Sequence, residues 1–166
     1  MTPTPEQIAA WNRELREKSP LETVRWAVAQ APGHAIVSTN FRPYEAVVLH
    51  LATQARPQIP VLWVDHGYNR AATYRHAEQL RAQLKLNLHA YLPRLTPAHR
   101  DAIHGPVPDT TDEAALKQFS TDMKLEPFNG ACVNSRPRSG SPLCARCKTP
   151  IGRSSISFPL IKTSVP

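Results

Sequence analysis

The fold is decided by residues 59–68, which read Ile-Pro-Val-Leu-Trp-Val-Asp-His-Gly-Tyr. The first six of these residues are almost uniformly apolar, which is typical of a strand buried on both faces of a parallel sheet. The apolar run ends at Asp65, and Gly67 follows in a short polar loop. Parallel strands are joined by crossovers that usually contain a helix. The sequence on either side should therefore alternate between helix and strand.

The flanking sequence has this alternation. A short apolar strand is predicted at residues 35–38, followed by a loop and a helix at about 44–55. A second helix is predicted at about 71–84 and a third strand at 86–91. Short loops between these elements indicate βαβ units, and hence an α/β fold with an open parallel sheet and helices on both faces. The helix at 44–55 is expected to bury Ala46, Val47, Leu49 and Leu51.

Helix start signals mark the N-terminal region. Thr4 and Ser19 each precede a proline, and each is followed three residues later by a side chain that can complete a capping box, Gln7 or Glu22. Two short helices are therefore predicted before the first strand.

The character of the chain changes after Phe128. Residues 93–112 are rich in Pro, Thr and His and are expected to be irregular, and a helix is predicted near 113–119. Residues 129–166 are rich in Ser, Pro and Arg, have no helical or strand periodicity, and could not bury a core. We therefore expect one ordered domain at residues 1–128 and a disordered tail at residues 129–166.

Composition limits the classes of function. A chain of 166 residues fits one ordinary domain. The net charge of +7 would suit a nucleic-acid binder, but residues 129–166 carry six basic residues and no acidic one. Without those six charges the rest of the chain is near +1 and has no basic stripe, so nucleic-acid binding is not expected. No apolar run could span a bilayer and no signal peptide opens the chain, so a cytoplasmic protein without a membrane partner is expected.

The cysteines are confined to the tail, at Cys132, Cys144 and Cys147. An odd number without a signal peptide does not indicate a disulfide framework. Cys144 and Cys147 have the Cys-x-x-Cys spacing of half a zinc site or a redox dithiol. A zinc site needs more ligands than the tail supplies, and a thioredoxin-type dithiol needs a strand-to-helix junction that is not predicted here. No metal site is therefore assigned.

Two loops are expected at the ligand-binding edge, because ligands of open parallel sheets bind beyond the carboxyl ends of the strands. The first loop, residues 38–43, reads Ser-Thr-Asn-Phe-Arg-Pro and runs into a helix N-terminus, where free N–H groups and the helix dipole favour an anion. Ser38 and Thr39 add hydroxyl donors, and Arg42 adds a charge suited to phosphate or sulfate. A capped turn with an exposed arginine fits the same residues, so both interpretations stay open.

The second loop, residues 65–68, follows the most apolar strand. Asp65 could accept a hydrogen bond from a ribose hydroxyl, and Gly67 would let the backbone approach a ligand. A turn capped by an aspartate fits equally well. His66 has no visible partner and is interpreted as a loop residue rather than a catalyst.

Ordered blocks around these loops resemble a known family. Residues 35–41 (Ala-Ile-Val-Ser-Thr-Asn-Phe) and 46–51 (Ala-Val-Val-Leu-His-Leu) resemble the opening of the phosphoadenylyl-sulfate (PAPS) and adenylyl-sulfate reductases, where a serine-rich loop precedes a helix ending Leu-His-Leu. Further matching blocks follow in the correct order, at residues 56–61, 65–68, 72–75, 84–88 and 124–129.

The resemblance implies an adenine-nucleotide α-hydrolase-like fold of the PP-loop superfamily, incomplete at the C-terminus. It also implies PAPS or a related adenine nucleotide as ligand, reduced to sulfite and adenosine 3′,5′-bisphosphate in sulfate assimilation and cysteine biosynthesis. In the family, a C-terminal cysteine thiolate attacks the sulfur, and thioredoxin or glutaredoxin resolves the product. A homodimer is possible, and the oligomeric state is left open. The residues carried over as nucleotide-binding are Ser38, Thr39, Asn40, Phe41, Arg42, Asp65, Gly67, Tyr68 and Thr73.

Several positions depart from the family pattern, which leaves the choice between PAPS and adenylyl sulfate open. Phe119-Ser120 occupy the place of a Cys-Cys pair in the iron–sulfur members, so no iron–sulfur cluster or other bound cofactor is expected. The usual glycine, serine, threonine and glutamate of the family are replaced, in that order, by Arg42, Glu45, His66 and Ala72.

The family pattern should continue beyond residue 128 with a helix and then Trp-Phe-x-x-Leu-Arg-x-x-Gln-x-x-x-Arg. Residues 138–152, back-translated with GC-rich codons and read in a shifted frame, can give Val-Trp-Phe-Thr-Ala-Leu-Arg-Ala-Leu-Gln-Asp-Pro-Asp-Arg. We therefore hypothesise a frame change at about Asn129, which leaves the basic motif and the nucleophilic cysteine out of the chain. No catalytic residue is assigned, and little or no reductase activity is expected. The alternatives are a non-catalytic nucleotide-binding remnant and an ATP pyrophosphatase of the same superfamily, whose Ser-Gly-Gly-x-Asp-Ser loop the chain does not contain.

Overall fold

The computed structural model describes residues 3–134 and contains a three-stranded parallel sheet. The strands β1 (Val37–Thr39), β2 (Pro60–Val64) and β3 (Asn87–Tyr91) lie side by side in chain order. In the register of the sheet, Thr39 is opposite Trp63 and Val64 is opposite Tyr91. The predicted strands are confirmed, and each observed strand starts one or two residues later than expected.

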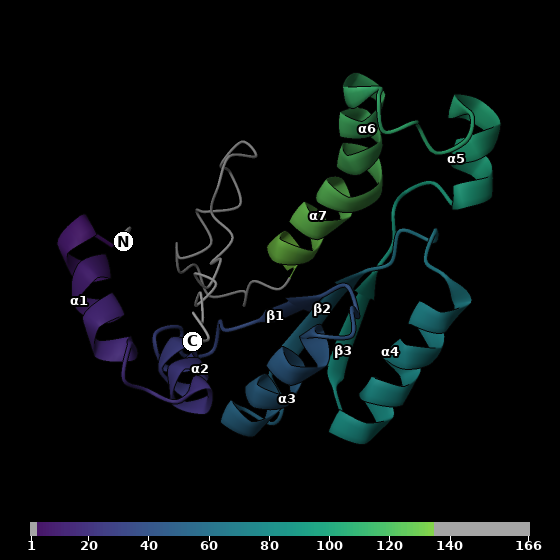
Figure 1. The fold of residues 1–166 in the computed structure, drawn as a ribbon. Coiled ribbons are helices and arrows are strands. Elements are labelled where there is room, and N and C mark those ends of the chain that lie inside the picture. Colours follow the sequence, from purple (N-terminus) through teal and green to yellow (C-terminus); the bar gives the residue numbers. More distant parts are fainter. Residues whose placement is uncertain (1–2, 135–166) are drawn as a thin grey trace, which may run out of the picture.

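Helices cover both faces of the sheet. Helix α3 (Glu45–Ala55) joins β1 to β2, and α4 (Ala71–Leu84) joins β2 to β3. Because the two crossovers run in the same direction across the sheet, both helices lie on the same face, which is the lower face in Figure 1. Helix α7 (Glu126–Asn134) contacts β2 and β3 from the opposite face (Figure 1). The predicted α/β fold with helices on both faces is confirmed.

The core lies between β2 and the helices α3 and α4. Val61 and Leu62 on the central strand are fully buried, which is what the apolar run predicted. Three aromatic rings pack one against the next in this core. The Phe41 ring packs edge-on against the Trp63 ring, with the ring centroids 5.0 Å apart, and the centroids of the Trp63 and Tyr74 rings are 5.8 Å apart. Leu49 of α3 and Leu80 of α4 complete the contact. Burial of this aromatic and aliphatic surface fixes the starting points of the two loops at the sheet edge.

Helix α3 exposes one residue that was expected to be buried. Val47 is 62% exposed and Val48 is 48% exposed, whereas Leu49 is 1% exposed. Residues two apart on a helix point in roughly opposite directions, about 200° apart. Since Leu49 and Ala52 face the core, Val47 must face away. The prediction for Val47 is wrong for this reason.

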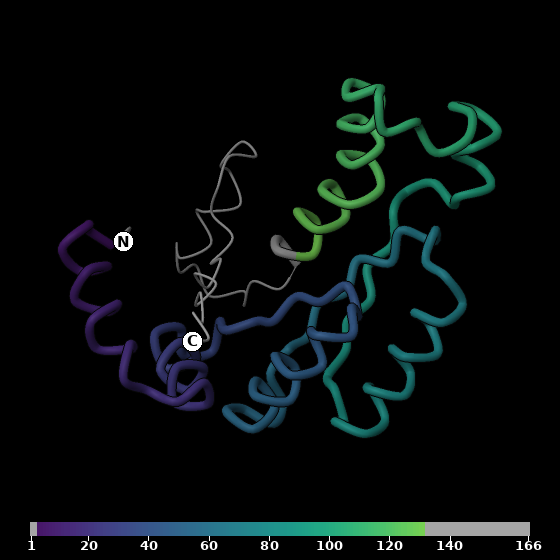
Figure 2. Tube along the Cα trace, in the orientation of Figure 1, coloured from purple at the N-terminus to yellow at the C-terminus, as the bar shows by residue number. Residues whose placement is uncertain are grey.

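The two N-terminal helices begin at the predicted caps. Thr4 caps α1 (Pro5–Leu15) and Ser19 caps α2 (Pro20–Ala29), each with both hydrogen bonds of a capping box. Figure 2 shows the chain passing through these helices before it enters the sheet. Helix α2 packs against α3, and α1 contributes no buried residue.

The region predicted to be irregular, residues 93–112, contains helix α5 (Pro97–His104). Thr96 caps it by accepting a hydrogen bond from the backbone N–H of His99, and Pro97 occupies the first turn. This is the same start signal as in α1 and α2. The expectation of an irregular segment is wrong because the high content of Pro and Thr was interpreted as a loop signal rather than as a cap.

The chain from residue 113 to residue 134 is continuously helical. Helix α6 (Glu113–Ser120) leads through a π-helical turn at Thr121–Leu125 into α7. Helix α7 therefore continues past Phe128, across the expected domain boundary. Helical structure within Asn129–Asn134 contradicts the expectation that regular structure stops at residue 128. The out-of-frame origin of the tail stays a prediction, and residues 135–166, with Cys144 and Cys147, lie outside the described residues.

Candidate functional site

The two predicted loops start next to each other. β1 and β2 are neighbouring parallel strands, and their last residues are close to the same level, with Thr39 opposite Trp63. The first loop (residues 38–43) therefore leaves the same edge of the sheet as the second loop (residues 65–68). This edge is where an open parallel sheet binds its ligands.

The first loop is organised around the hydroxyl of Thr39, a residue that is only 5% exposed. The hydroxyl accepts a hydrogen bond from the backbone N–H of Phe41 (2.9 Å) and donates one to Oε2 of Glu45 (2.8 Å). The same Oε2 atom accepts from the backbone N–H groups of Asn40 (2.7 Å) and Arg42 (3.3 Å). The loop therefore presents a cluster of donors to one negatively charged oxygen.

Glu45 was not among the predicted site residues. It lies in the first turn of α3, where negative charge interacts favourably with the helix dipole. The sequence contained one signal for it, an acidic residue at a position where the family often has serine.

The side chains of the first loop divide between the core and the surface. Phe41 is 2% exposed and has a backbone φ of 54°, in the left-handed region. Its ring packs on Trp63, so only its backbone can contribute to a site at the sheet edge. Ser38, Asn40 and Arg42 are exposed at the edge. Phe41 is therefore the structural residue of this loop, which the sequence did not distinguish from its polar neighbours.

The second loop is organised around Asp65. Its Oδ1 atom accepts from the backbone N–H of Gly67 (2.9 Å), from Asn69 Nδ2 (3.0 Å) and from the Tyr74 hydroxyl (2.8 Å). Burial of Tyr74, together with its hydrogen bond to Asp65, raises the pKa of the phenol, which keeps this donor protonated at neutral pH. Oδ1 is therefore used by the protein itself, and a ribose hydroxyl would have to bind Oδ2.

The close approach of helix α5 requires a glycine at position 67. Its φ is 78°, and a Cβ atom at this position would clash with the Pro97 ring. The sequence predicted that this glycine would let the backbone approach a ligand, but the group that approaches it is Pro97. Tyr68 makes a second connection to α5, because its hydroxyl donates to Asp101 Oδ1 at 2.5 Å and lies 3.3 Å from the carbonyl oxygen of Pro97. Burial, followed by the Asp101 contact, raises the pKa of Tyr68.

His66 has a partner that the sequence did not reveal. Its Nδ1 atom accepts from the backbone N–H of Tyr68 at 3.1 Å, and the two rings stack with their centroids 6.2 Å apart. Burial, with a smaller contribution from the positive charge of Lys124, lowers the pKa of His66 below 6.5, and Asp65 opposes this shift. The imidazole is therefore neutral at pH 7, as an acceptor at Nδ1 requires.

Arg100 connects this loop to the rest of the chain and was also missed. It is 6% exposed, and Nη1 donates to the carbonyl oxygens of Gly105 (2.7 Å) and Pro106 (3.0 Å) and to Asp101 (3.2 Å). Its guanidinium lies 4.8 Å from the centre of the Phe119 ring. Arg100 thus fixes Asp101, which in turn holds Tyr68.

Thr73 lies in the first turn of α4, behind the second loop, and is half-buried. The structure therefore places all nine predicted residues at or directly behind one edge of the sheet. Eight of them belong to the two loops, and Thr73 belongs to the helix that follows the second loop. Their role in binding stays a proposal.

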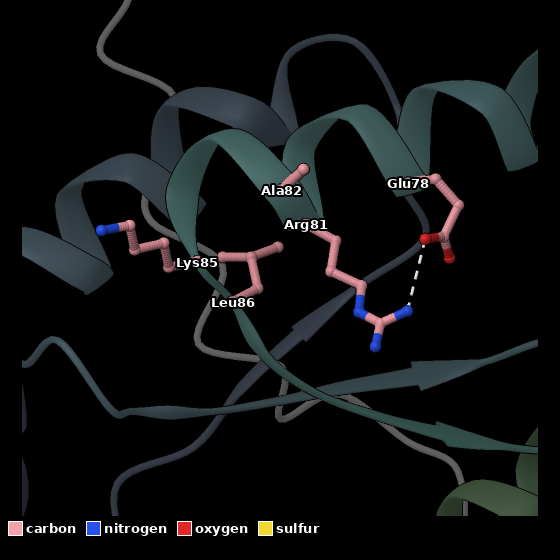
Figure 3. Close-up of a pocket in the computed structure, with 5 residues that line it drawn as sticks. All are labelled: Glu78, Arg81, Ala82, Lys85 and Leu86. Atoms are coloured by element: carbon pink, nitrogen blue, oxygen red, sulfur yellow. Dashed lines mark hydrogen bonds and ion pairs between the residues drawn. The ribbon is translucent and has the colours of Figure 1, made fainter.

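A surface depression of about 450 Å³ lies elsewhere. Its lining residues come from the C-terminal end of α4 and the start of the connection to β3, at the opposite end of α4 from the second loop. Figure 3 shows the side chains of Glu78 and Arg81 paired along one side of this depression, at 3.3 Å, and Lys85 extending away from them. Exposed charged side chains that pair with each other do not form a preorganised ligand site.

Residues 3–134 contain no group of three or more His, Cys, Asp or Glu side chains placed to hold a metal ion. In the same part of the chain, no helix is both long enough and apolar enough to cross a membrane.

A comparison with protein families agrees with this arrangement of loops and strands. The model of the phosphoadenosine phosphosulfate reductase domain matches residues 34–136, which include both loops and all three strands. The chain belongs to this family. The predicted membership, made on the blocks around the two loops, is confirmed.

The relatives it resembles are named phosphoadenosine 5′-phosphosulfate reductases. One from a Synechococcus species is 36% identical over 120 residues, covering 72% of this chain and 52% of the relative. One from Pectobacterium atrosepticum is 39% identical over 132 residues, covering 78% of this chain and 54% of the relative. The chain thus spans about half the length of these curated relatives.

A solved structure agrees in fold. The phosphate complex of a PAPS reductase from Candida auris superimposes with a TM-score of 0.69 at 24% sequence identity, over 81% of this chain and 65% of that one. This likeness supports the PP-loop type of fold predicted from the sequence.

Proposed function

We propose that residues 34–134 form the part of a PAPS reductase that binds the sulfonucleotide. One observation carries the proposal: the loops at residues 38–43 and 65–68 leave neighbouring parallel strands at the same sheet edge, inside the segment that matches the family. In this proposal the ligand is PAPS, an adenine nucleotide with several anionic groups. The complete reaction, in which PAPS is reduced to sulfite and adenosine 3′,5′-bisphosphate in sulfate assimilation, rests on the family.

The two loops offer complementary chemistry. The first loop has backbone N–H groups, the Thr39 hydroxyl and the N-terminus of α3, which together suit a phosphate or sulfate group. Exposed Arg42 adds a positive charge beside them. The second loop has the free Oδ2 atom of Asp65, which suits a hydroxyl donor such as a ribose. We assign the anionic end of the nucleotide to the first loop and the sugar to the second.

The reductive half of the reaction needs a nucleophilic thiolate and a dithiol reductant of the thioredoxin or glutaredoxin type. Residues 1–131 contain no cysteine, so this segment has no thiolate of its own that could attack the sulfur. We therefore propose that residues 34–131 bind the nucleotide without turning it over by themselves, in the cytoplasm and without a bound cofactor. This non-catalytic binding role is the second candidate function, and the cysteine distribution favours it.

Calorimetric titration of the purified chain with PAPS, adenosine 3′,5′-bisphosphate and ATP tests the proposal. We expect PAPS and adenosine 3′,5′-bisphosphate to bind and ATP to bind more weakly. Tighter binding of ATP would favour the pyrophosphatase alternative. A sulfite-release assay with PAPS and thioredoxin should show little turnover, and normal turnover would contradict the non-catalytic role.

A pair of arginine variants locates the ligand. Arg42→Ala should weaken PAPS binding by about tenfold, because it removes a charge-assisted contact to the anionic end. Arg81→Ala, which removes another exposed arginine, at the depression of Figure 3, should leave the affinity unchanged. The reverse result would place the ligand at that depression and overturn the proposed site.

A further inference from the structure

The donor cluster of the first loop already binds an anionic group of the protein itself, the carboxylate of Glu45. Oε2 of Glu45 accepts from the Thr39 hydroxyl at 2.8 Å, from the Asn40 N–H at 2.7 Å and from the Arg42 N–H at 3.3 Å. One donor is on Thr39, the last residue of β1, and two are on the residues that follow it, and all three converge on a single oxygen atom.

A carboxylate oxygen and an oxygen of a phosphate or sulfate group accept hydrogen bonds from the same kind of donors. Both are negatively charged acceptors, and both form short hydrogen bonds to N–H and O–H groups at a helix N-terminus. They cannot use the donors together, because each N–H directs one hydrogen and two anions at this distance repel each other. Glu45 and the anionic end of a nucleotide therefore compete for the same groups.

We propose that Glu45 is a specificity-determining residue that competes with the ligand's anionic group for the first loop. This inference rests on the proposed function, because it concerns the same loop. A ligand that binds there must first displace the carboxylate from its three donors, and the displaced carboxylate stays on the first turn of α3, close to the incoming charge. Glu45 therefore lowers the affinity of the loop for phosphate- and sulfate-bearing ligands and favours ligands that place less negative charge at this loop.

A purely structural role for Glu45 makes a different prediction. Tyr44, the residue before it, makes no side-chain capping hydrogen bond, so Glu45 also stabilises the start of α3. Either role predicts that removing the carboxylate lowers the stability of the fold. Only competition predicts that removing it raises the affinity for anions.

The experiment uses the full chain and three variants. Glu45→Gln keeps the length of the side chain and removes its charge. Glu45→Ser removes the charge and also shortens the side chain. Glu113→Gln is the matched control, because Glu113 is also an acid in the first turn of a helix, α6, and is exposed and outside the two loops. The probes are sodium sulfate, adenosine 3′,5′-bisphosphate and adenosine, each titrated by calorimetry, with the thermal midpoint measured in parallel.

We expect Glu45→Ser to bind sulfate and adenosine 3′,5′-bisphosphate about tenfold to a hundredfold more tightly than the unmodified chain, the range expected when one set of charge-assisted hydrogen bonds no longer has to be broken. Glu45→Gln should show a smaller gain in the same direction. Adenosine, which has no anionic group, should bind all chains equally, and Glu113→Gln should bind as the unmodified chain does. If Glu45→Ser has a lower thermal midpoint, added sulfate should restore it.

The outcomes separate this inference from the proposed function. Equal affinity of the unmodified chain and both Glu45 variants for adenosine 3′,5′-bisphosphate overturns the role of Glu45 and leaves the nucleotide site standing. A gain for sulfate without any contribution from the adenosine part supports the role of Glu45 and contradicts a nucleotide as ligand. No binding of any probe by any chain overturns both.

Discussion

The two loops lie at the same sheet edge but are held in place by different kinds of contact. The hydrogen bonds of the first loop are local, because every hydrogen bond of Thr39 and Glu45 within it joins residues at most six positions apart, and only the Phe41 ring reaches the core. The second loop depends on helix α5, since Tyr68 bonds to Pro97 and Asp101, 29 and 33 positions away. A local contact survives changes elsewhere in the chain, whereas a long-range contact depends on the packing of a second element.

This difference in contacts suits the first loop to binding a ligand and the second loop to structural support. The first loop has donors that a ligand could use, and its own glutamate occupies them. In the second loop most polar groups satisfy one another, as with the three donors on Asp65 Oδ1. The first loop is therefore suited to exchange one anion for another, and the second loop to form a rigid wall beside it.

The largest expected effect tests the anchor of the first loop. Phe41→Ala should lower the free energy of unfolding by about 4 kcal/mol, because it removes a fully buried ring and leaves a cavity beside Trp63. Phe41→Leu, the control that keeps a large apolar side chain, should cost clearly less than Phe41→Ala. Urea unfolding measures both. A cost below about 1 kcal/mol for Phe41→Ala would mean that the ring faces the ligand edge instead.

The next effect tests the support of the second loop through α5. Arg100→Ala should lower the free energy of unfolding by about 3 kcal/mol, because a buried side chain is removed and two part-buried carbonyl oxygens and Asp101 lose their donor. Arg81→Ala, at an exposed ion pair, should cost less than about 0.5 kcal/mol. Similar costs for the two arginines would contradict the claim that α5 supports the loop.

The order of helices and strands could be predicted because it depends on local signals. The apolar run at residues 59–64 identified the central strand, and the predicted bounds of α4 agree with those observed. Helix α5 carried the same kind of signal at Thr96-Pro97, and it was missed because a stretch rich in Pro and Thr is also typical of loops.

The contacts of the site could be predicted only in part. The sequence placed Thr39 and Asp65 at the correct edge, since strand ends alone determine that. It could not show that Glu45 turns back onto the loop, or that Asp101 meets Tyr68 across 33 positions. Such pairs depend on loop conformation and on how α5 packs, neither of which has a period or spacing in the sequence.

A smaller effect tests how closely α5 approaches the second loop. Gly67→Ala and Gly33→Ala both place a Cβ at a φ near +78°, which costs about 1 to 2 kcal/mol. Only at Gly67 does the added Cβ also meet Pro97, whereas at Gly33 no heavy atom lies within 4 Å. We expect Gly67→Ala to cost about 2 kcal/mol more than Gly33→Ala in urea unfolding. Equal costs would mean that Pro97 moves away freely.

The smallest effect is a pH dependence of stability from His66. Because the pKa of His66 is lowered in the fold, below the ordinary value of 6.5, the unfolded chain binds a proton there more readily than the folded chain. Acidification through pH 6.5 should therefore favour unfolding, and this contribution is absent above that pH. His66→Asn keeps an acceptor near the Tyr68 N–H and removes the titrating ring. Between about pH 7.5 and about pH 5.5 the unmodified chain should lose more stability than His66→Asn, as measured by urea unfolding at each pH. The same loss in both chains would show that the ring is as easily protonated in the folded loop as in solution, and the second loop would then be less rigid than its contacts to α5 indicate.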